Sequence, residues 1–223
     1  MRKQRGGPAE RPGVALDYDG VIADTNTIKS RWIRRHLRRD VPPWETDRTN
    51  CVRLIGIEDY LRMAPDAYGW RASLAARPVP GARRALRTLA ARCRVYLLTA
   101  RWGSMLRGCR AWLRQNGLDR HIEGYLTGGH ANGQGEGKAA LCAKHGIRAL
   151  VDDDERHFIG VDDPGVLRVL FKNGARGRVK VPRGSKLFTG WADLLPWLLA
   201  KLTRKGGRPT PRAGATPRRG GRS

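Results

Sequence analysis

A short apolar run near the start of the chain, Val14 to Leu16, leads directly into two carboxylates, Asp17 and Asp19, and then Gly20. The apolar run predicts a buried strand, and the polar residues after it predict an acidic site at the carboxyl end of that strand. Two like charges this close repel each other, so the arrangement is unfavourable for stability alone. A bound Mg²⁺ would relieve the repulsion, because this ion prefers carboxylate and carbonyl oxygens. The feature therefore favours an enzyme.

Strand and helix patterns alternate along most of the chain. Apolar runs predict strands at Val14–Asp17, Arg94–Leu98, Ile122–Leu126, Ile147–Val151 and Val166–Phe171. Amphipathic helical patterns separate several of these runs, and Ser104 is the expected N-cap of one helix. This alternation predicts an α/β fold with a Rossmann-like parallel sheet of about five strands and helices on both faces. In such sheets the functional site lies at the carboxyl ends of the strands.

One segment, residues 25–76, interrupts the alternation with helical patterns only. Its first apolar stripe includes Ile28, Trp32 and Ile33. Because the segment directly follows the acidic strand end, we interpret it as a small helical cap inserted over the site, within a core of residues 14–200.

The charge of the chain is extreme, at +24 with 44 Lys and Arg against 20 Asp and Glu. Residues 1–13 and 203–223 are rich in Gly, Pro and Arg, and we predict that both are disordered basic tails. The tails favour non-specific binding of nucleic acid. An arginine-rich bias of the coding sequence explains the same composition equally well.

Cysteine usage and hydropathy narrow the class further. The four cysteines form no CxxC pair, which excludes a zinc ribbon and a thioredoxin motif and favours reduced, buried thiols in a cytoplasmic protein. The N-terminus has no apolar signal region, and no apolar run reaches the roughly 18 residues of a membrane span. We therefore expect no membrane partner. The oligomeric state does not follow from the sequence.

Polar residues at four points of the predicted fold can converge on one site. They are Asp17-x-Asp19, Thr99 at the end of an apolar strand, Lys138 at the start of a short helix, and Asp152-Asp153-Asp154 after another apolar strand. Each has an ordinary structural explanation alone: a helix cap, a solvated charge or a turn. Their joint occurrence, in this order and at the right ends of the elements, favours a catalytic site.

The motifs ALDYDGV, LLT, Lys138 and ALVDDD closely resemble, in this order, those of the haloacid dehalogenase (HAD) superfamily of phosphohydrolases. The resemblance covers about residues 14–200. Within the superfamily, residues 22–25, the small helical cap and a closing Trp-containing helix look like the 5′(3′)-deoxyribonucleotidase group. The resemblance implies a HAD-like fold and a Mg²⁺-dependent phosphomonoesterase whose small phosphorylated substrate is a nucleotide.

The resemblance also implies catalytic roles. Asp17 would attack phosphorus and form an aspartyl-phosphate. Asp19 would protonate the leaving oxygen and then deprotonate water. Thr99 and Ala100 would bind the phosphoryl group, and Lys138 would neutralise charge on Asp17 and on the phosphate.

The implied metal ligands are the Asp17 side chain, the Asp19 backbone carbonyl, and the acidic pair Asp152 and Asp153. Of this pair, Asp153 takes the usual ligand position and Asp152 supports it. A third consecutive carboxylate, Asp154, leaves the register of the metal ligands open by one residue.

Other interpretations stay open. The glycine-rich segment 128–137 fails the P-loop pattern at Asn132 and Ala139, and we interpret it as a flexible rim loop. The basic charge favours, as alternatives, a phosphatase acting on nucleic-acid ends or a non-catalytic nucleic-acid-binding protein. Trp32, Trp44 and Tyr60 are candidates for stacking on a base.

Deletion of residues 1–11 and 205–223 is predicted to leave the melting temperature and small-substrate turnover nearly unchanged, because these segments bury little apolar surface. The same deletion weakens any binding to oligonucleotides and flattens its salt dependence. Thermal melts and salt titrations of both proteins test this. A truncated protein that is unfolded would contradict it.

Overall fold

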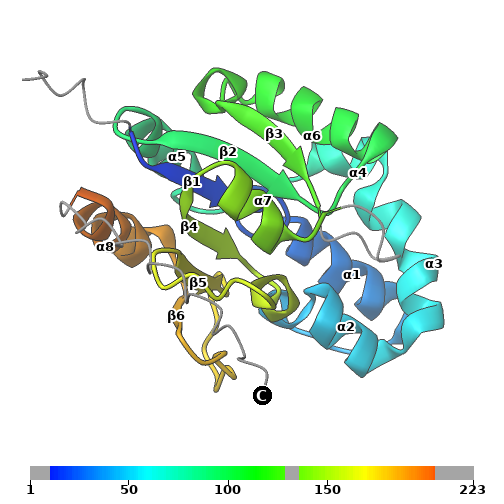
Figure 1. Cartoon of the computed structure of the whole chain (residues 1–223). Helices are drawn as coiled ribbons and strands as arrows, with labels where there is room; N and C mark the ends of the chain where they lie inside the picture. The colour runs from blue at the N-terminus through cyan, green and yellow to red at the C-terminus, as the bar shows by residue number, and fades with distance from the viewer. Residues whose placement is uncertain (1–10, 129–135, 204–223) are drawn as a thin grey trace, which may run out of the picture.

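The computed structural model describes residues 11–128 and 136–203 (Figure 1). Six strands form one sheet in the order β3-β2-β1-β4-β5-β6, and every neighbouring pair is parallel. The strands are β1 (Gly13–Leu16), β2 (Arg94–Thr99), β3 (Gly124–Thr127), β4 (Ile147–Asp152), β5 (Leu167–Phe171) and β6 (Ser185–Phe188). The predicted α/β fold is confirmed.

The helices are α1 (Thr25–Leu37), α2 (Arg48–Ile55), α3 (Ile57–Tyr68), α4 (Trp70–Ala75), α5 (Ala82–Ala90), α6 (Gly103–Gln115), α7 (Lys138–Lys144) and α8 (Trp191–Thr203). Short 3₁₀ turns add η1 (Pro43–Glu45), η2 (Asp119–His121) and η3 (Glu155–Phe158). Regular structure thus begins at Gly13 and continues to Thr203, slightly beyond the expected core.

Two local expectations differ from the structure. The sheet has a sixth strand, β6, which carries a single buried residue, Phe188, and therefore lacks the apolar run that revealed the other strands. The expected N-cap Ser104 is wrong, because α6 already begins at Gly103 and Trp102 occupies the cap position without a side-chain hydrogen bond. Most of the glycine-rich segment 128–137 lies outside the described residues.

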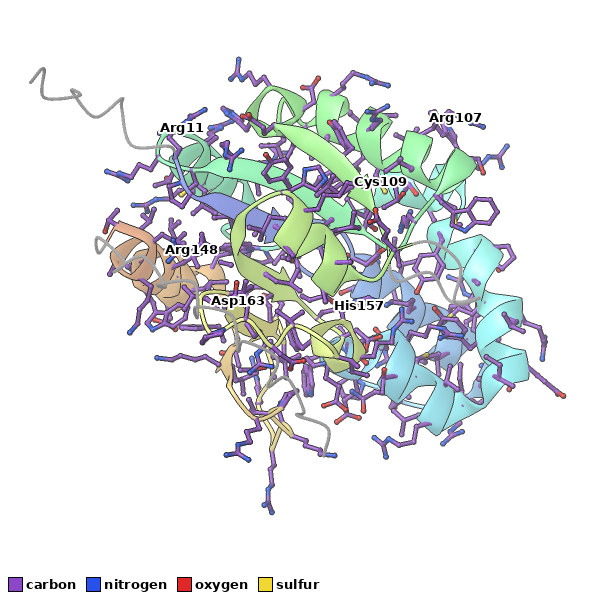
Figure 2. The ribbon with its side chains drawn as sticks, in the orientation of Figure 1. Arg11, Arg107, Cys109, Arg148, His157 and Asp163 are labelled. Carbon is purple, nitrogen blue, oxygen red and sulfur yellow. The ribbon has the colours of Figure 1, made fainter. Side chains whose placement is uncertain are left out.

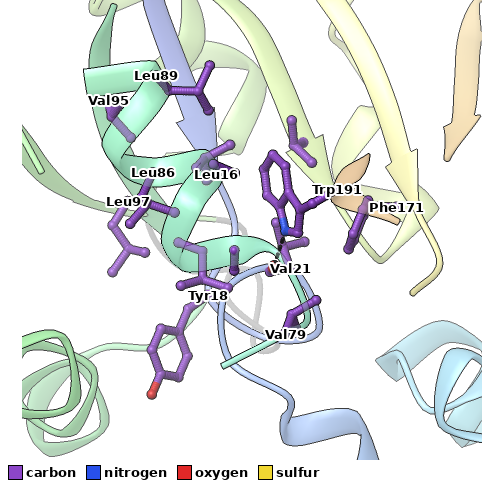
Figure 3. Close-up of a cluster of buried hydrophobic side chains, with 14 of the residues drawn as sticks. Leu16, Tyr18, Val21, Val79, Leu86, Leu89, Val95, Leu97, Phe171 and Trp191 are labelled. Carbon is purple, nitrogen blue, oxygen red and sulfur yellow. Dashed lines mark hydrogen bonds between the residues drawn. The ribbon is translucent and has the colours of Figure 1, made fainter. Parts of the chain in front are cut away.

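The central strand separates two apolar layers because its side chains alternate between the two faces of the sheet. Val14 and Leu16 belong to the cluster built with α5, α6 and α8, whereas Ala15 belongs to the cluster built with α7. Figure 3 shows the first layer, where Leu86 of α5 lies near Leu16. The sheet is therefore covered on both faces, and its strand ends remain available for a site.

Helices α1–α4 lie between β1 and β2 in sequence, and we call residues 25–76 the cap. Figure 1 shows α1, α2 and α3 together beyond the arrowheads of the central strands. The cap has its own apolar cluster, which includes Trp32, Ile33 and Met63. Asp24 caps the first helix by accepting a hydrogen bond from the Thr27 amide at 3.1 Å. This N-cap hydrogen bond fixes where the chain leaves the strand end.

Within the described residues, no helix is both long and apolar enough to cross a membrane.

Replacement of Trp191 by Phe is predicted to destabilise the fold by about 1–3 kcal/mol. Its indole is 2% exposed and donates to the Val21 carbonyl at 2.9 Å, the dashed line in Figure 3. The change leaves that buried carbonyl unpaired. Urea unfolding measures the effect, with Trp70→Phe as the matched control because Trp70 is 53% exposed. Equal effects of the two changes would contradict this account.

Candidate active site

The ends of three adjacent strands bring the predicted site residues together. Leu16 of β1 pairs with Leu97 of β2 on one side and with Val151 of β4 on the other. Asp17 follows β1 by one residue, and Asp152 is the last residue of β4. Because the strands are parallel and in register, both carboxylates lie at the same edge of the sheet, below the cap.

Lys138 bridges the two carboxylates. Its ammonium donates to Asp17 Oδ1 at 2.8 Å and to Asp152 Oδ2 at 2.6 Å, and its side chain is fully buried. Burial lowers the pKa of Lys138, but the two carboxylates raise it by more, so the pKa lies above its ordinary value. The lysine is therefore a fixed positive charge between two strand ends.

Asp152 has a second partner on η3. His157 Nδ1 lies 2.9 Å from Asp152 Oδ1 in a hydrogen bond whose donor depends on the imidazole tautomer. Burial raises the pKa of Asp152, but His157 and Lys138 together lower it below its ordinary value. Figure 2 shows His157 at the end of the sheet that faces the cap. This carboxylate is thus held ionised by two buried partners.

Asp17, Asp152 and Asp153 form a cluster whose oxygens lie within 4.8 Å of one another. Burial raises the pKa of Asp17 to about 6, with Lys138 opposing the shift, and burial raises that of Asp153 well above its usual range. Asp17 and Asp153, next to the ionised Asp152, therefore resist ionisation unless a further cation joins them. Their hard oxygens suit a divalent cation, so the residues present fit a metal site.

The three consecutive aspartates have different surroundings. The Asn26 amide donates to Asp153 Oδ2 at 2.8 Å and fixes that carboxylate. Asp154 lies outside the cluster, because it accepts from the Thr49 hydroxyl at 2.6 Å and from Arg156 Nε at 2.8 Å. The sequence left open which of the three consecutive aspartates lies with Asp17. In this structure Asp153 lies in the cluster with Asp17, and Asp154 contacts the cap.

Asp19 is held by a partner that the sequence did not identify. Arg101 Nε and Nη2 donate to the two oxygens of Asp19 at 2.9 and 2.7 Å, and the Thr25 hydroxyl donates at 2.7 Å. Burial raises the pKa of Asp19, but the Arg101 guanidinium lowers it by more, so the pKa lies below its ordinary value. Asp19 is therefore ionised in this arrangement. Its amide also donates to Asp17 Oδ2 at 3.0 Å.

Arg101 connects the core to the cap. Its guanidinium lies between the rings of Tyr18 and Tyr68, at 4.9 and 5.0 Å from their centroids, and donates to the Ser73 hydroxyl at 2.7 Å. Thr99, the predicted phosphate ligand, is fully buried and accepts from the Arg101 amide at 3.2 Å. Ala100 lies between Thr99 and Arg101 in sequence and lines a cavity at the strand ends.

A cavity of about 210 Å³ lies between the strand ends and the cap. Asp17, Asp19 and Asp153 line its floor, and cap residues line its roof: Lys29, Asp47, Arg48, Tyr60, Leu61, Ala64 and Tyr68. The hydroxyls of Tyr60 and Tyr68 are 3.0 Å apart and share a hydrogen bond. The site is thus a carboxylate floor under a roof of cations and tyrosines.

Of the three aromatic residues named from the sequence, Tyr60 lines this cavity. Trp32 instead packs within the cap, where its indole donates to Asp66 at 2.9 Å and stacks on His36. Trp44 lines neighbouring cavities. Sequence reasoning missed Tyr68 and Lys29, which carry no motif and reach the site only through the packing of the cap helices.

Several solved structures have a similar fold. They include a HAD-superfamily hydrolase of subfamily IA from Geobacter sulfurreducens (19% identity, 84% of this chain and 96% of that chain covered, TM-score 0.53). A second is a HAD family hydrolase from Deinococcus radiodurans with bound phosphate and sodium. The match covers 87% of this chain and 97% of that chain, at 14% identity and a TM-score of 0.58. A predicted phosphatase from Clostridium acetobutylicum covers 86% and 100% at 12% identity and a TM-score of 0.59.

No family model matches this sequence, and the search among curated proteins also found no match. The structural similarity and the strand order together show the fold: this chain has the α/β fold of HAD-superfamily hydrolases. Its cluster of buried aspartates lies at the carboxyl ends of the central strands of that fold.

Mg²⁺ is predicted to raise the melting temperature more at pH 7.5 than at pH 5. Because the pKa of Asp17 is raised to about 6 and that of Asp153 well above its ordinary value, both groups increasingly destabilise the metal-free protein as the pH rises above the ordinary aspartate pKa of 3.8. Protons compete with the metal for the same oxygens at the lower pH. At a Mg²⁺ concentration of about 100 Kd, the increase at pH 7.5 is on the order of 5 °C.

Scanning calorimetry with and without Mg²⁺ at both pH values measures this difference. Asp162→Asn, an exposed aspartate outside the site, serves as the control and keeps the full Mg²⁺ response. An equal increase at both pH values, or no increase at either, would contradict a metal site at these carboxylates.

Proposed function

We propose that this protein is a Mg²⁺-dependent phosphomonoesterase that hydrolyses a nucleotide through an aspartyl-phosphate on Asp17. The observation that carries the proposal is the contact of Lys138 with both Asp17 and Asp152, next to Asp153 and below a cavity. Phosphoryl transfer needs a placed nucleophile and neutralisation of phosphoryl charge, and these residues supply both.

In the first step one carboxylate oxygen of Asp17 attacks phosphorus, and the bond between phosphorus and the ester oxygen breaks. Lys138 and the Asp19 amide each bind one oxygen of Asp17 in the structure, so the carboxylate cannot rotate freely. The attacking lone pair belongs to an oxygen whose direction is already fixed. This orientation lowers the entropic cost of the attack.

Asp19 moves the proton in both steps of the proposed reaction. Its ionised state, held by Arg101, suits the second step, in which it accepts a proton from the water that attacks the aspartyl-phosphate. The first step needs a protonated Asp19, so the contact with Arg101 must loosen when substrate enters. The proton then passes to the leaving oxygen.

Asp17, Asp153 and the Asp19 carbonyl would hold Mg²⁺, with Asp152 supporting them through Lys138. When bound, Mg²⁺ neutralises charge on the phosphoryl oxygens. The donor set is made of oxygens only, which favours Mg²⁺ over softer metals.

A nucleotide is the proposed substrate because Tyr60 and Tyr68 line the roof of the cavity and can contact a sugar or base. The motif resemblance to 5′(3′)-deoxyribonucleotidases supports the same class. Among the structures of similar fold, one is a predicted phosphoglycolate phosphatase from Haemophilus somnus, and one contains bound phosphate. The four buried, unpaired cysteines support a cytoplasmic location.

A second candidate function is removal of phosphate from nucleic-acid ends. A cavity of about 340 Å³ beside the site is lined by the aromatic Trp44 and by basic residues, although Glu45 and Glu155 line it too. Its basic residues are Arg53, Lys172, Arg178 and Lys180. Figure 2 shows nitrogen-tipped side chains spread widely over the surface, so the charge is not confined to this cavity. Within the described chain, the second candidate function therefore depends on this one cavity.

Asp17→Asn is predicted to reduce turnover of a nucleoside monophosphate by at least ~10³-fold, because the amide is a far weaker nucleophile of nearly the same shape. EDTA abolishes wild-type activity, Mg²⁺ restores it, and Ca²⁺ does not, because Ca²⁺ prefers longer bonds and more ligands. Steady-state kinetics of both proteins, and of the Asp162→Asn control, measure these effects.

Retention of more than about a tenth of wild-type turnover by Asp17→Asn, or activity after exhaustive chelation, would contradict the mechanism. The substrate class is tested separately, by comparing nucleoside monophosphates with sugar phosphates of equal charge. A preference for the sugar phosphates would remove the nucleotide assignment and leave the phosphatase assignment intact.

A further inference from the structure

The cations around the site differ in whether a carboxylate pairs with them. Four form salt bridges of 2.8 Å or less: Arg101 with Asp19, Lys138 with Asp17 and Asp152, Arg156 with Asp154, and Lys172 with Asp47. Among the residues that the structure describes, Lys29 and Arg48 line the same cavity and form no salt bridge. In the described chain these two cations of the roof therefore have no carboxylate within salt-bridge distance, and their donors are available to a ligand.

Lys29 extends from α1 and is 1% exposed. Its ammonium lies over the Tyr68 ring, 5.8 Å from the centroid, and no side-chain hydrogen bond from it is present within the described chain. Burial lowers the pKa of Lys29, but Asp153 and Asp19 raise it by more, so the group stays charged. A buried ammonium that faces a cavity without a hydrogen-bond acceptor indicates that an acceptor enters from outside.

Arg48 is the first residue of α2, and its side chain reaches the other tyrosine. Its guanidinium lies 5.7 Å from the Tyr60 ring centroid, and its Nε is buried without a hydrogen-bond partner. The hydrogen bond between Tyr60 and Tyr68 joins the two tyrosines that carry the cations. Lys29 and Arg48, which we call the roof cations, therefore form one unit held by the cap.

The floor of the site already supplies what the reacting phosphate needs. Lys138 and the carboxylate cluster with its cation lie around Asp17, where phosphorus is attacked. The roof cations come from two different helices of the cap, α1 and α2, and line the same cavity. A guanidinium and an ammonium with free donors are the groups that proteins use for phosphate.

We propose that Lys29 and Arg48 bind a second anionic group of the substrate, a phosphate or phosphodiester carried by the same sugar as the ester phosphate that is cleaved. The inference rests on the proposed phosphatase function and narrows its substrate class. The cavity, at about 210 Å³, is smaller than the roughly 300 Å³ of sites that enclose a drug-sized ligand. It is therefore too small to enclose a whole nucleoside bisphosphate, and the proposal places in it the sugar and its two phosphates.

Two sources carry this chemistry: a nucleoside 3′,5′-bisphosphate, and the phosphorylated end of a nucleic-acid strand. The test measures binding rather than turnover, using Asp17→Asn protein with Mg²⁺ in titration calorimetry. The ligands are AMP, adenosine 3′,5′-bisphosphate and a 5′-phosphorylated dinucleotide. We expect the two ligands with a second phosphate to bind at least about tenfold more tightly than AMP.

The ratio of the Kd for AMP to the Kd for a ligand with a second phosphate measures the contribution of that phosphate. Lys29→Gln and Arg48→Gln, each added to Asp17→Asn, reduce this ratio to about threefold or less, whereas Lys29→Arg keeps it because the charge remains. Arg31→Gln and Arg35→Gln are the controls: both residues are exposed on α1, and these changes remove the same charge while keeping the ratio. Melting curves establish that each variant is folded.

Equal affinity of the parent protein for AMP and the bisphosphate overturns the proposal. So does an equal loss for AMP and the bisphosphate in the Gln variants, which would place the roof cations on the reacting phosphate. The tighter of the two larger ligands identifies the source. Because binding is measured without turnover, failure of the phosphatase function appears separately, as wild-type protein that hydrolyses none of the three ligands.

Discussion

The buried contact of Lys138 with Asp17 and Asp152 is the interaction on which the site depends. Its ammonium replaces solvent for two carboxylates at the ends of the paired strands β1 and β4, and its charge offsets the repulsion between them. Removing one partner of such a contact leaves an uncompensated charge in the interior. The same ion bridge therefore holds the strand ends together and orients the proposed nucleophile.

At the site, the cap is connected to the core by polar contacts: Asn26 with Asp153, Thr25 with Asp19, and Thr49 with Asp154. Away from the site, Ile28 and Leu74 of the cap pack against the main apolar cluster of the core, beside the cap's own cluster. Arg101 adds a link from the core side to Ser73. A substrate phosphate competes for the same donors, so substrate binding changes the contacts between the cap and the core.

Much of this architecture could be predicted from the sequence, because buried parallel strands are short apolar runs and their ends carry the polar residues. Asp17 and Asp152 were found in this way, Lys138 was named at the start of a short helix, and the structure brings the three into contact. The half-exposed edge strand β6 lacked such a run and was missed.

The roof of the site was less predictable. Lys29 and Tyr68 sit in helices whose periodicity marks them only as helix residues, and their convergence depends on how α1 packs on α3 and α4. Trp32 carried the stronger sequence signal for stacking on a base, yet its indole donates a hydrogen bond to Asp66 inside the cap. Local pattern thus predicts the floor, where residues follow strands, and not the roof, where tertiary packing decides.

The covalent step tests the central claim most directly. Wild-type protein is mixed with Mg²⁺ and a nucleoside monophosphate, quenched in acid and reduced with borohydride, which converts an acyl phosphate to an alcohol. Peptide mass spectrometry then locates the reduced residue. The account predicts homoserine at position 17 and an unmodified Asp19. Reduction at another residue, or none while substrate is being turned over, would contradict the assignment of Asp17 as the nucleophile.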